Sequence, residues 1–270
     1  MKKTGLLFLV MLFVLSVPIA EADPPDISTI VKKSLDALDA GRQGSTKVVI
    51  TLKEGNQVTS EWGARMAHKE FKDGRRALLV LLEPESLKGN AYLFWKPVDK
   101  PLKEWVYFPA TRRVRSLTAL MAYDSFLGTD FTWGDLGIKD PGGTDKFLAE
   151  EVHTGKKSYK IETIPDEQWY YSRIVSWIAA DTFLPIQRDY YDTQGSLWKT
   201  KLFGNVVVLN NIPMPLQIRM LDVKGNRSTE VIISDVCLDV EYIPKEAFDP
   251  EKLPGAALSP VCSVPIPKKK

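Results

Sequence analysis

The stretch RRALLVLLEPESLKGNAYLFWK, Arg75 to Lys96, is decisive for the kind of fold this chain forms. Two short runs of aliphatic, β-branched and aromatic residues are separated by turn residues that include LKG, a pattern typical of two antiparallel strands. The first run is apolar at every position from Ala77 to Leu82. Because alternate residues of a strand face opposite sides of a sheet, a sheet with one wet face alternates apolar and polar residues. Both faces of this sheet are therefore predicted to be covered.

The same pattern of short apolar runs separated by turn residues continues in both directions along the chain. Short strand-like segments follow one another at roughly ten-residue spacing, with DTQG and VKGN as hairpin turns. This order favours an antiparallel sandwich or barrel over a parallel α/β sheet. The further predicted strands are residues 46–53, 57–67, 103–110, 157–164, 172–180, 185–192, 196–209, 215–223 and 227–236.

One helix is predicted before the first strand, over residues 26–40. Apolar residues recur there at three- and four-residue spacing, Asp26 is a suitable N-cap, and Gly41 stands where the helix would end.

The first 22 residues have the pattern of a secretory signal peptide. Lys2 and Lys3 precede an apolar run from Leu6 to Val17, and Ala20-Glu21-Ala22 is a small-residue cleavage site. The apolar run is shorter than the ~20 residues of a membrane-spanning helix, which disfavours an uncleaved anchor. We therefore predict cleavage after Ala22, export to the periplasm, and one domain over residues 23–270 with a short C-terminal tail.

Charge and cysteine content narrow the function classes. The formal net charge is +2 over 270 residues, which gives no electrostatic footprint for nucleic acid. Cys237 and Cys262 are the two cysteines, and the sequence leaves open whether they form a disulfide.

Motifs for catalysis are missing from the sequence. His68 and His153 lack a second histidine or a cysteine at metal-ligand spacing, and no nucleophile elbow, phosphate loop or dinucleotide fingerprint is present. Asp124, Asp130 and Asp135 lack the spacing of a calcium loop, and turn or cap chemistry is the favoured interpretation. The sequence predicts no enzyme, no metal and no cofactor.

Strands that are apolar on both faces allow two interpretations. One face packs on a core, and the other either lies under helices or a second sheet, or lines a cavity for an apolar guest. The strand pattern alone leaves this choice open.

Two neighbouring segments carry a resemblance to a known family. WVYFPATRRVRSL, Trp105 to Leu117, followed by DSFLGTDFTWGDL, Asp124 to Leu136, resembles the paired signature of the outer-membrane lipoprotein-sorting-protein-like family, which is similar to the periplasmic carrier LolA. SWIAADTFLPIQRDYYDTQGSLWKT, Ser176 to Thr200, and IPKEAFDPEKL, Ile243 to Leu253, resemble later parts of that family.

The resemblance implies a mainly β fold, a half-open antiparallel β-barrel of the LolA/LolB type covered by a few helices. It implies a carrier of lipid or acylated protein with an apolar cavity, transient membrane contact and, for some members, an inner-membrane transporter of the RND type. Ten residues are predicted to line the cavity: Leu79, Leu81, Tyr92, Phe94, Trp105, Tyr107, Phe126, Phe131, Trp133 and Trp177. Four are predicted to form a partner interface: Arg112, Arg113, Arg115 and Asp130.

Two alternatives to a carrier remain open at this point. An adaptor subunit of a transporter assembly would have a filled core and an exposed docking patch. An envelope hydrolase would have a cleft in which Asp124, Asp130 or His68 has a perturbed pKa and meets a second polar group.

Overall fold

The structure, a computed structural model, describes residues 25–39, 41, 43–98, 100, 102–117, 123–136, 142–166, 169–238, 243–256 and 258. The predicted signal peptide and Cys262 lie outside these residues. The described elements are α1 (Ile27–Leu38), β1 (Gln43–Glu54), β2 (Gln57–Phe71), β3 (Gly74–Glu83), β4 (Ala91–Pro97), β5 (Lys103–Phe108), β6 (Arg113–Ser116), η2 (Gly134–Leu136), β7 (Thr144–His153), β8 (Lys156–Ile164), β9 (Arg173–Ala179), β10 (Pro185–Tyr191), β11 (Leu197–Leu209), β12 (Ile212–Asp222), β13 (Arg227–Leu238), η3 (Lys245–Phe248) and η4 (Pro250–Gly255).

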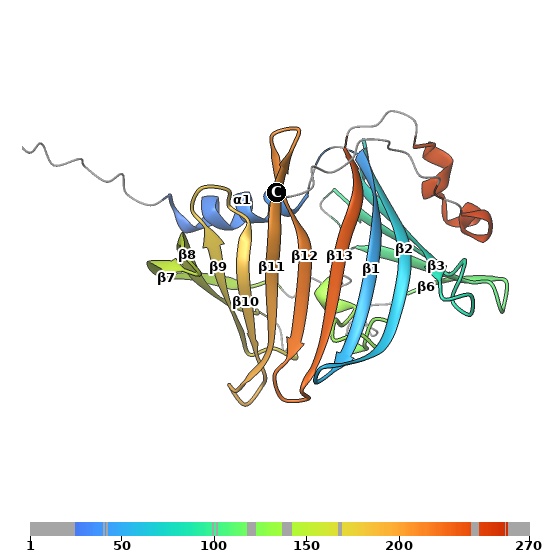
Figure 1. Cartoon of the computed structure of the whole chain (residues 1–270). Coiled ribbons are helices and arrows are strands. Elements are labelled where there is room, and N and C mark those ends of the chain that lie inside the picture. The colour runs from blue at the N-terminus through green and yellow to red at the C-terminus, as the bar shows by residue number, and fades with distance from the viewer. Residues whose placement is uncertain are drawn as a thin grey trace, which may run out of the picture.

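The strands form one curved antiparallel sheet in the described part of the chain (Figure 1). Its order is β6-β5-β4-β3-β2-β1-β13-β12-β11-β10-β9-β8-β7, so two meanders meet where β1 pairs with β13. The predicted antiparallel fold class is confirmed. β6 and β7 are consecutive in the chain but lie at opposite edges of the sheet, so the chain between them has to cross from one edge to the other.

Strand β7 was missed by the sequence analysis. Four of the ten residues in its sequence TDKFLAEEVH are charged, and the strand is exposed along most of its length. An edge strand pairs on one side only and is protected from aggregation by charged side chains, which removes the apolar signal that marks the other strands.

Helix α1 was predicted closely. The side chain of Asp26 caps it by accepting a hydrogen bond from the Thr29 amide at 3.0 Å. Ile30 is fully buried and packs on Tyr159, Ile161 and Ile178 of β8 and β9. The helix therefore covers the second meander on one face of the sheet.

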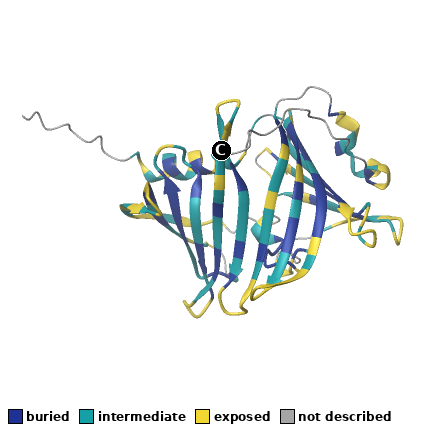
Figure 2. Ribbon diagram, viewed as in Figure 1, coloured by how far each residue is buried: buried dark blue, intermediate teal, exposed yellow. Residues whose placement is uncertain are grey.

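The sheet has an apolar cluster on each face. The larger cluster lies on the face that α1 covers and contains inward residues of both meanders together with residues 123–136. The smaller cluster, on the opposite face of β2 to β5, is covered by η3 and η4 through Phe248 and Leu253. Figure 2 shows buried residues gathered along the strands and exposed residues at the turns. This arrangement confirms that both faces of β3 and β4 are covered.

The cysteine near the end of β13 and the length of the helices are relevant to where the protein is located. Cys237, near the end of β13, is buried and disulfide-bonded. Among the helices of the described residues, none has both the length and the apolar character needed to cross a bilayer.

Candidate functional site

The concave face of the sheet, defined here as the face that α1 covers, carries the candidate site. Adjacent strands are in register so that Met66, Leu79 and Tyr92 lie side by side on β2, β3 and β4. Tyr92 pairs in turn with Val106 on β5. These side chains belong to one apolar cluster that continues through β1 and β13 to Met220 on β12 and Tyr190 on β10.

Residues 123–136, the lid segment, pack onto this face. The rings of Phe126 and Trp133 meet edge to face at 4.9 Å, and Tyr92 lies 5.5 Å from Phe126 and 5.9 Å from Trp133, measured between ring centroids. Phe131 is equally buried. Edge-to-face aromatic pairs add roughly 0.5–1.5 kcal/mol to simple burial. All three lid aromatics lie buried in the apolar cluster of the concave face.

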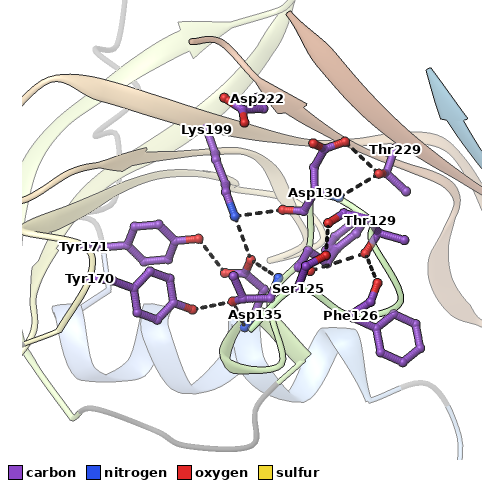
Figure 3. Close-up of polar contacts among 12 residues, drawn as sticks. Ser125, Phe126, Thr129, Asp130, Asp135, Tyr170, Tyr171, Lys199, Asp222 and Thr229 are labelled. Carbon is purple, nitrogen blue, oxygen red and sulfur yellow. Dashed lines mark hydrogen bonds and ion pairs between the residues drawn. The ribbon is translucent and has the colours of Figure 1, made fainter. Parts of the chain in front are cut away.

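A polar cluster fastens the lid segment to the second meander (Figure 3). Asp130 donates its amide hydrogen to Thr229 Oγ1 at 2.9 Å, and that hydroxyl donates back to Asp130 Oδ2 at 2.8 Å. The carbonyl of Asp130 accepts a hydrogen bond from Lys199 Nζ at 2.8 Å, and Arg227 Nε lies 3.5 Å from Asp130 Oδ1. Every polar group of Asp130 therefore has a partner on β11 or β13.

Asp135 makes the second anchor. Its carboxylate accepts hydrogen bonds from the Thr132 amide and the Tyr171 hydroxyl, both at 2.8 Å, and lies 3.6 Å from Lys199 Nζ. The Thr132 hydroxyl shares a hydrogen bond of 2.6 Å with Tyr170. Asp135 thus both caps its own turn, as the favoured interpretation predicted, and ties the lid segment to β11.

Burial shifts the pKa values of this cluster toward the neutral forms. It raises the pKa of Asp130, against the opposing effects of the Thr229 hydrogen bond and the Arg227 charge. It lowers the pKa of Lys199, against the attraction of the Asp135 carboxylate. Charges that are costly to bury are retained here because each meets an opposite charge or a hydrogen-bond partner.

The predicted cavity set divides between the two faces. Leu79, Leu81, Tyr92 and Phe94 lie on the concave face with the three lid aromatics. Trp105 and Tyr107 do not: they lie in the opposite cluster with Phe248 and Leu253. On β5 the residues that face the concave side are Glu104, Val106 and Phe108. The prediction of which alternate residues of this strand face the cavity was therefore wrong. Because the strand is apolar on both faces, its alternation could not reveal which side is which, and an error of one residue exchanges them.

Trp177 is also on the other side of the sheet. Its ring stacks on His153 at 4.6 Å and its Nε1 donates a hydrogen bond to Glu151 at 2.6 Å. Its register partners on the neighbouring strands are Lys160 and Gln187. Its predicted place in the cavity was wrong.

The predicted interface set divides as well. Arg112, Arg113 and Arg115 are exposed at and beside the edge strand β6, and Val114 between them packs inward against the smaller cluster. Asp130 is buried in the lid anchor and makes no contact with these arginines, so its predicted place in an exposed interface was wrong.

The side chains considered for catalysis do not come together. His153 is hydrogen-bonded to Gln187 at 3.0 Å on the outer face, whereas His68 lies at a concave position of β2. Asp124 is exposed, and Asp130 is enclosed by Thr229, Lys199 and Arg227. Within the described ranges, no group of three or more acidic, histidine or cysteine side chains could hold a metal ion.

Three concave side chains escaped the sequence analysis. Glu104 on β5 is 1% exposed, and neither of its carboxyl oxygens has a hydrogen-bond partner in the part of the chain that the structure describes; burial raises its pKa to about 8. Arg188 on β10 and Lys201 on β11 are register partners that both face inward. A charged residue on the concave side of an otherwise apolar strand could have identified these three side chains. The sequence alone does not show which residues of a strand face the concave side, so they were recognised only in the structure.

Two hollows open near α1. A wide one of about 1390 Å³ lies at the rim, between the C-terminal half of α1 and the turns that end β2, β4, β9 and β11. A smaller one of about 340 Å³ lies beneath α1, against β7 to β10. The region beneath the lid segment is filled by its aromatic side chains.

The comparisons with known proteins agree with this geometry. A family model described as "Uncharacterized protein" matches residues 73–254, more than half of the chain. A comparison with curated protein sequences gives no match.

Three solved structures share the fold. A domain described as an outer membrane lipoprotein-sorting protein, from Vibrio parahaemolyticus, has a TM-score of 0.76 and 22% identity over 84% of this chain and 97% of that one. A DUF1329 family protein from Desulfovibrio piger has a TM-score of 0.74 and 23% identity over 84% and 98%. A LolA superfamily protein from Nitrosomonas europaea has a TM-score of 0.63 and 18% identity over 82% and 96%. The chain therefore belongs to the family of that model, and it has the LolA-like fold that these solved structures share, as the resemblance of residues 105–136 predicted.

Proposed function

We propose that the chain is a periplasmic carrier that shields the acyl chains of a lipid or a lipidated protein on its concave face. The observation that carries this proposal is the lid segment. Its three buried aromatics occupy the concave face without a covalent link to the strands that they cover, and two aspartates anchor them. An acyl chain that took the place of these rings would find the same apolar wall.

Burial alone supplies the energy for binding. Each CH₂ group removed from water contributes about 0.8 kcal/mol, so even part of an acyl chain repays the displacement of a few aromatic contacts. Release needs no covalent chemistry: the lid segment returns to its site when the cargo passes to a partner with a better one. The carrier is therefore proposed to be non-enzymatic.

The setting follows from the rest of the sequence. Residues 1–22 are proposed to direct export to the periplasm. Arg112, Arg113 and Arg115, exposed at one edge of the sheet, are suited to contact an anionic membrane surface or an inner-membrane transporter, for which the RND type is the candidate. Such a partner would supply the energy for loading.

A second candidate is an adaptor subunit that binds no lipid. The observation that favours it is the filled concave face, where Phe126, Phe131 and Trp133 are only 5%, 5% and 6% exposed. In that case the lid segment would be a permanent part of the core, and the basic edge would be the functional surface.

Native mass spectrometry and lipid extraction of the protein, purified from periplasm without detergent, test the carrier directly. A discrete lipid or acylated peptide that leaves on denaturation is expected. Phe94 and Trp95 provide a matched pair, because these half-buried neighbours on β4 face opposite sides of the sheet. Phe94→Ser should lower the amount of bound lipid, and Trp95→Ser should leave it unchanged.

If no lipid or acylated peptide is bound, even after incubation with a membrane extract, the carrier function is contradicted and the adaptor function is favoured. Equal loss of lipid in the two variants would place the guest elsewhere than on the concave face.

A further inference from the structure

The hollow beneath α1 combines apolar walls with polar atoms that lack partners. Its volume of about 340 Å³ is at the lower end of the range of roughly 300–1,000 Å³ found for ligand pockets. Its apolar lining comes from both α1 and the sheet: Val31, Leu35, Ile161, Ile174 and Ile178. Leu35 is 53% exposed, so the hollow has an apolar side chain at its border on the helix surface.

Two buried polar atoms at this hollow have no hydrogen-bond partner among the described residues. One is Nε of Arg188 on β10, and the other is Oγ of Ser34, a residue that is 2% exposed on the inner side of α1. Buried donors in folded proteins are nearly always paired, and leaving one unpaired costs about 1–3 kcal/mol. Two such donors on opposite walls of one hollow indicate a group that accepts hydrogen bonds between them.

Arg188 lines the hollow, and a second cation, Lys201, lies next to it on the neighbouring strand. Lys201 lies opposite Arg188 in the β10–β11 register, and neither has an acidic side chain within ion-pair distance among the described residues. The ammonium of Lys201 lies over the rings of Phe131 and Phe203, at 5.3 and 5.4 Å from their centroids. Burial, followed by repulsion from Arg188, lowers the pKa of Lys201 to about 8. The charge of Asp135 in the lid segment opposes this shift, although it is not within ion-pair distance of Lys201.

One carboxylate also borders the hollow. Asp145 on β7 lies on its opposite side and accepts a hydrogen bond from Thr163 Oγ1 at 2.6 Å. Its charge is partly satisfied by this bond, and it makes no ion pair with Arg188 among the contacts of the described residues. Arg188 therefore shares the hollow with one carboxylate that is already engaged, and Lys201 beside it feels the charge of Asp135 from the lid segment.

We propose that the hollow beneath α1 binds the anionic head group, a carboxylate or a phosphate, of a single-chain amphiphile between Arg188 and Ser34. The guanidinium donates to the head-group oxygens, the Ser34 hydroxyl donates from the helix, and Lys201 supplies the second positive charge. The chain of the amphiphile lies along the apolar lining toward Leu35. This inference rests on the proposed carrier function and specifies the class of cargo that the carrier prefers.

The test compares laurate with its neutral glycerol ester, monolaurin, which has the same chain and no charge. Titration calorimetry of the purified protein at pH 7 should give a laurate affinity at least about tenfold higher than that of monolaurin, the size expected from one charge-assisted interaction of 1.5–3 kcal/mol. Arg188→Gln should bring the ratio close to one without abolishing monolaurin binding, and Arg188→Lys should restore part of it. Arg219→Gln is the matched control, because Arg219 lies on β12 with its side chain on the opposite face, paired with Glu230.

A second variant avoids the buried position. Leu35→Glu changes an exposed residue at the border of the hollow, where folding should be unaffected, and places a carboxylate against it. It should weaken laurate binding more than monolaurin binding. A circular dichroism spectrum and a melting curve confirm that each variant is folded.

Each outcome has a distinct meaning. A preference for laurate that survives Arg188→Gln or Leu35→Glu, or equal binding of the two amphiphiles to the natural protein, overturns the head-group site and leaves the carrier standing. Binding of inorganic phosphate together with no binding of either amphiphile indicates a free-anion site and also overturns the inference. Failure of both amphiphiles to bind, with no lipid in the purified protein, removes the carrier function itself.

Discussion

Lys199 on β11 and Asp135 in the lid segment form an ion pair at 3.6 Å whose side chains are only 4% and 1% exposed. Among the ion pairs of the described residues, the other pairs all have at least one partner with substantial exposure. The pair joins the lid to the sheet, and Lys199 also donates to the carbonyl of Asp130. One side chain on the sheet therefore holds both anchors of the lid.

Replacing Lys199 by methionine should destabilise the protein by about 3–5 kcal/mol, because the Asp135 carboxylate then stays buried without its counter-ion. Chemical denaturation measures the loss, and hydrogen exchange should show faster opening of residues 123–136. Lys199→Met combined with Asp135→Asn should recover part of the loss, since no isolated charge remains.

Lys224→Met serves as the control for this change. Lys224 pairs with Asp192, and its own side chain is 48% exposed, so water can solvate the partner after its loss, which should cost about 0–1 kcal/mol. A Lys199→Met protein as stable as the control variant would show that the buried pair does not hold the lid.

Glu104 should make the stability of the fold depend on pH. Its pKa is about 8 in the folded protein, raised by burial from an ordinary value of 4.5. Between these two values the unfolded chain has lost a proton that the folded chain keeps, so the contribution of Glu104 to stability is present below pH 4.5 and is lost as the pH rises to 8. Glu104→Gln removes this titration. The stability of the variant relative to the natural protein should therefore rise with pH by up to about 1.4 kcal/mol per pH unit between pH 5 and 8.

Urea unfolding at pH 5, 6.5 and 8 measures this slope. Glu85→Gln is the control, because the Glu85 side chain is 84% exposed and its replacement should give a difference that does not change with pH. Parallel stability curves for Glu104→Gln and the natural protein would mean that Glu104 is ionised throughout or solvated when folded.

The sequence predicted an element best where a single local feature of the residues determines the structure. The helix at residues 27–38 has a cap, a period and a stop, and all three are local. The strands of the two meanders were recognisable because their apolar residues must be covered, and the lid aromatics were recognisable because a glycine-rich loop with three large rings needs an apolar place to bury them.

Strand phase and long-range charge pairing could not be predicted in the same way. Trp105 and Val106 are both apolar, so only the pairing of Val106 with Tyr92 shows which of them is concave. Asp130 and Thr229 are 99 residues apart in the chain, and their hydrogen bonds depend on how β13 is placed in the sheet. The predicted exposure of Asp130 failed because a short acid in a polar-looking loop carries no local sign of a distant partner.

Opening the lid should expose the concave face to a hydrophobic probe. Trp133→Ala removes a ring that contacts both Tyr92 and Phe126, which should cost about 3–5 kcal/mol and loosen the lid segment. Binding of the dye N-phenyl-1-naphthylamine, followed by its fluorescence, should increase relative to the natural protein.

Trp177→Ala provides the comparison, since Trp177 is similarly buried at 8% exposure but lies on the outer face of β9. It should lower stability without increasing dye binding. If the two variants bind equal amounts of dye, the probe is reporting general loosening and not access to the concave face.

The basic edge of the sheet should contribute to membrane contact. Arg113 and Arg115 on β6 are exposed and make no ion pair among the contacts of the described residues. Reversing both to glutamate should change the free energy of unfolding by less than about 0.5 kcal/mol per site. Since each basic residue near an anionic bilayer contributes about 1 kcal/mol, loss of the two should weaken binding to vesicles of phosphatidylglycerol and phosphatidylethanolamine by about thirtyfold or more.

Reversing Lys146 and Lys156, which are exposed on β7 and β8 at the opposite edge, makes the same change in net charge at a different place. Vesicle co-sedimentation compares the two. A similar loss in both variants would mean that only net charge matters, and no loss in the arginine variant would remove the basic edge from the membrane contact.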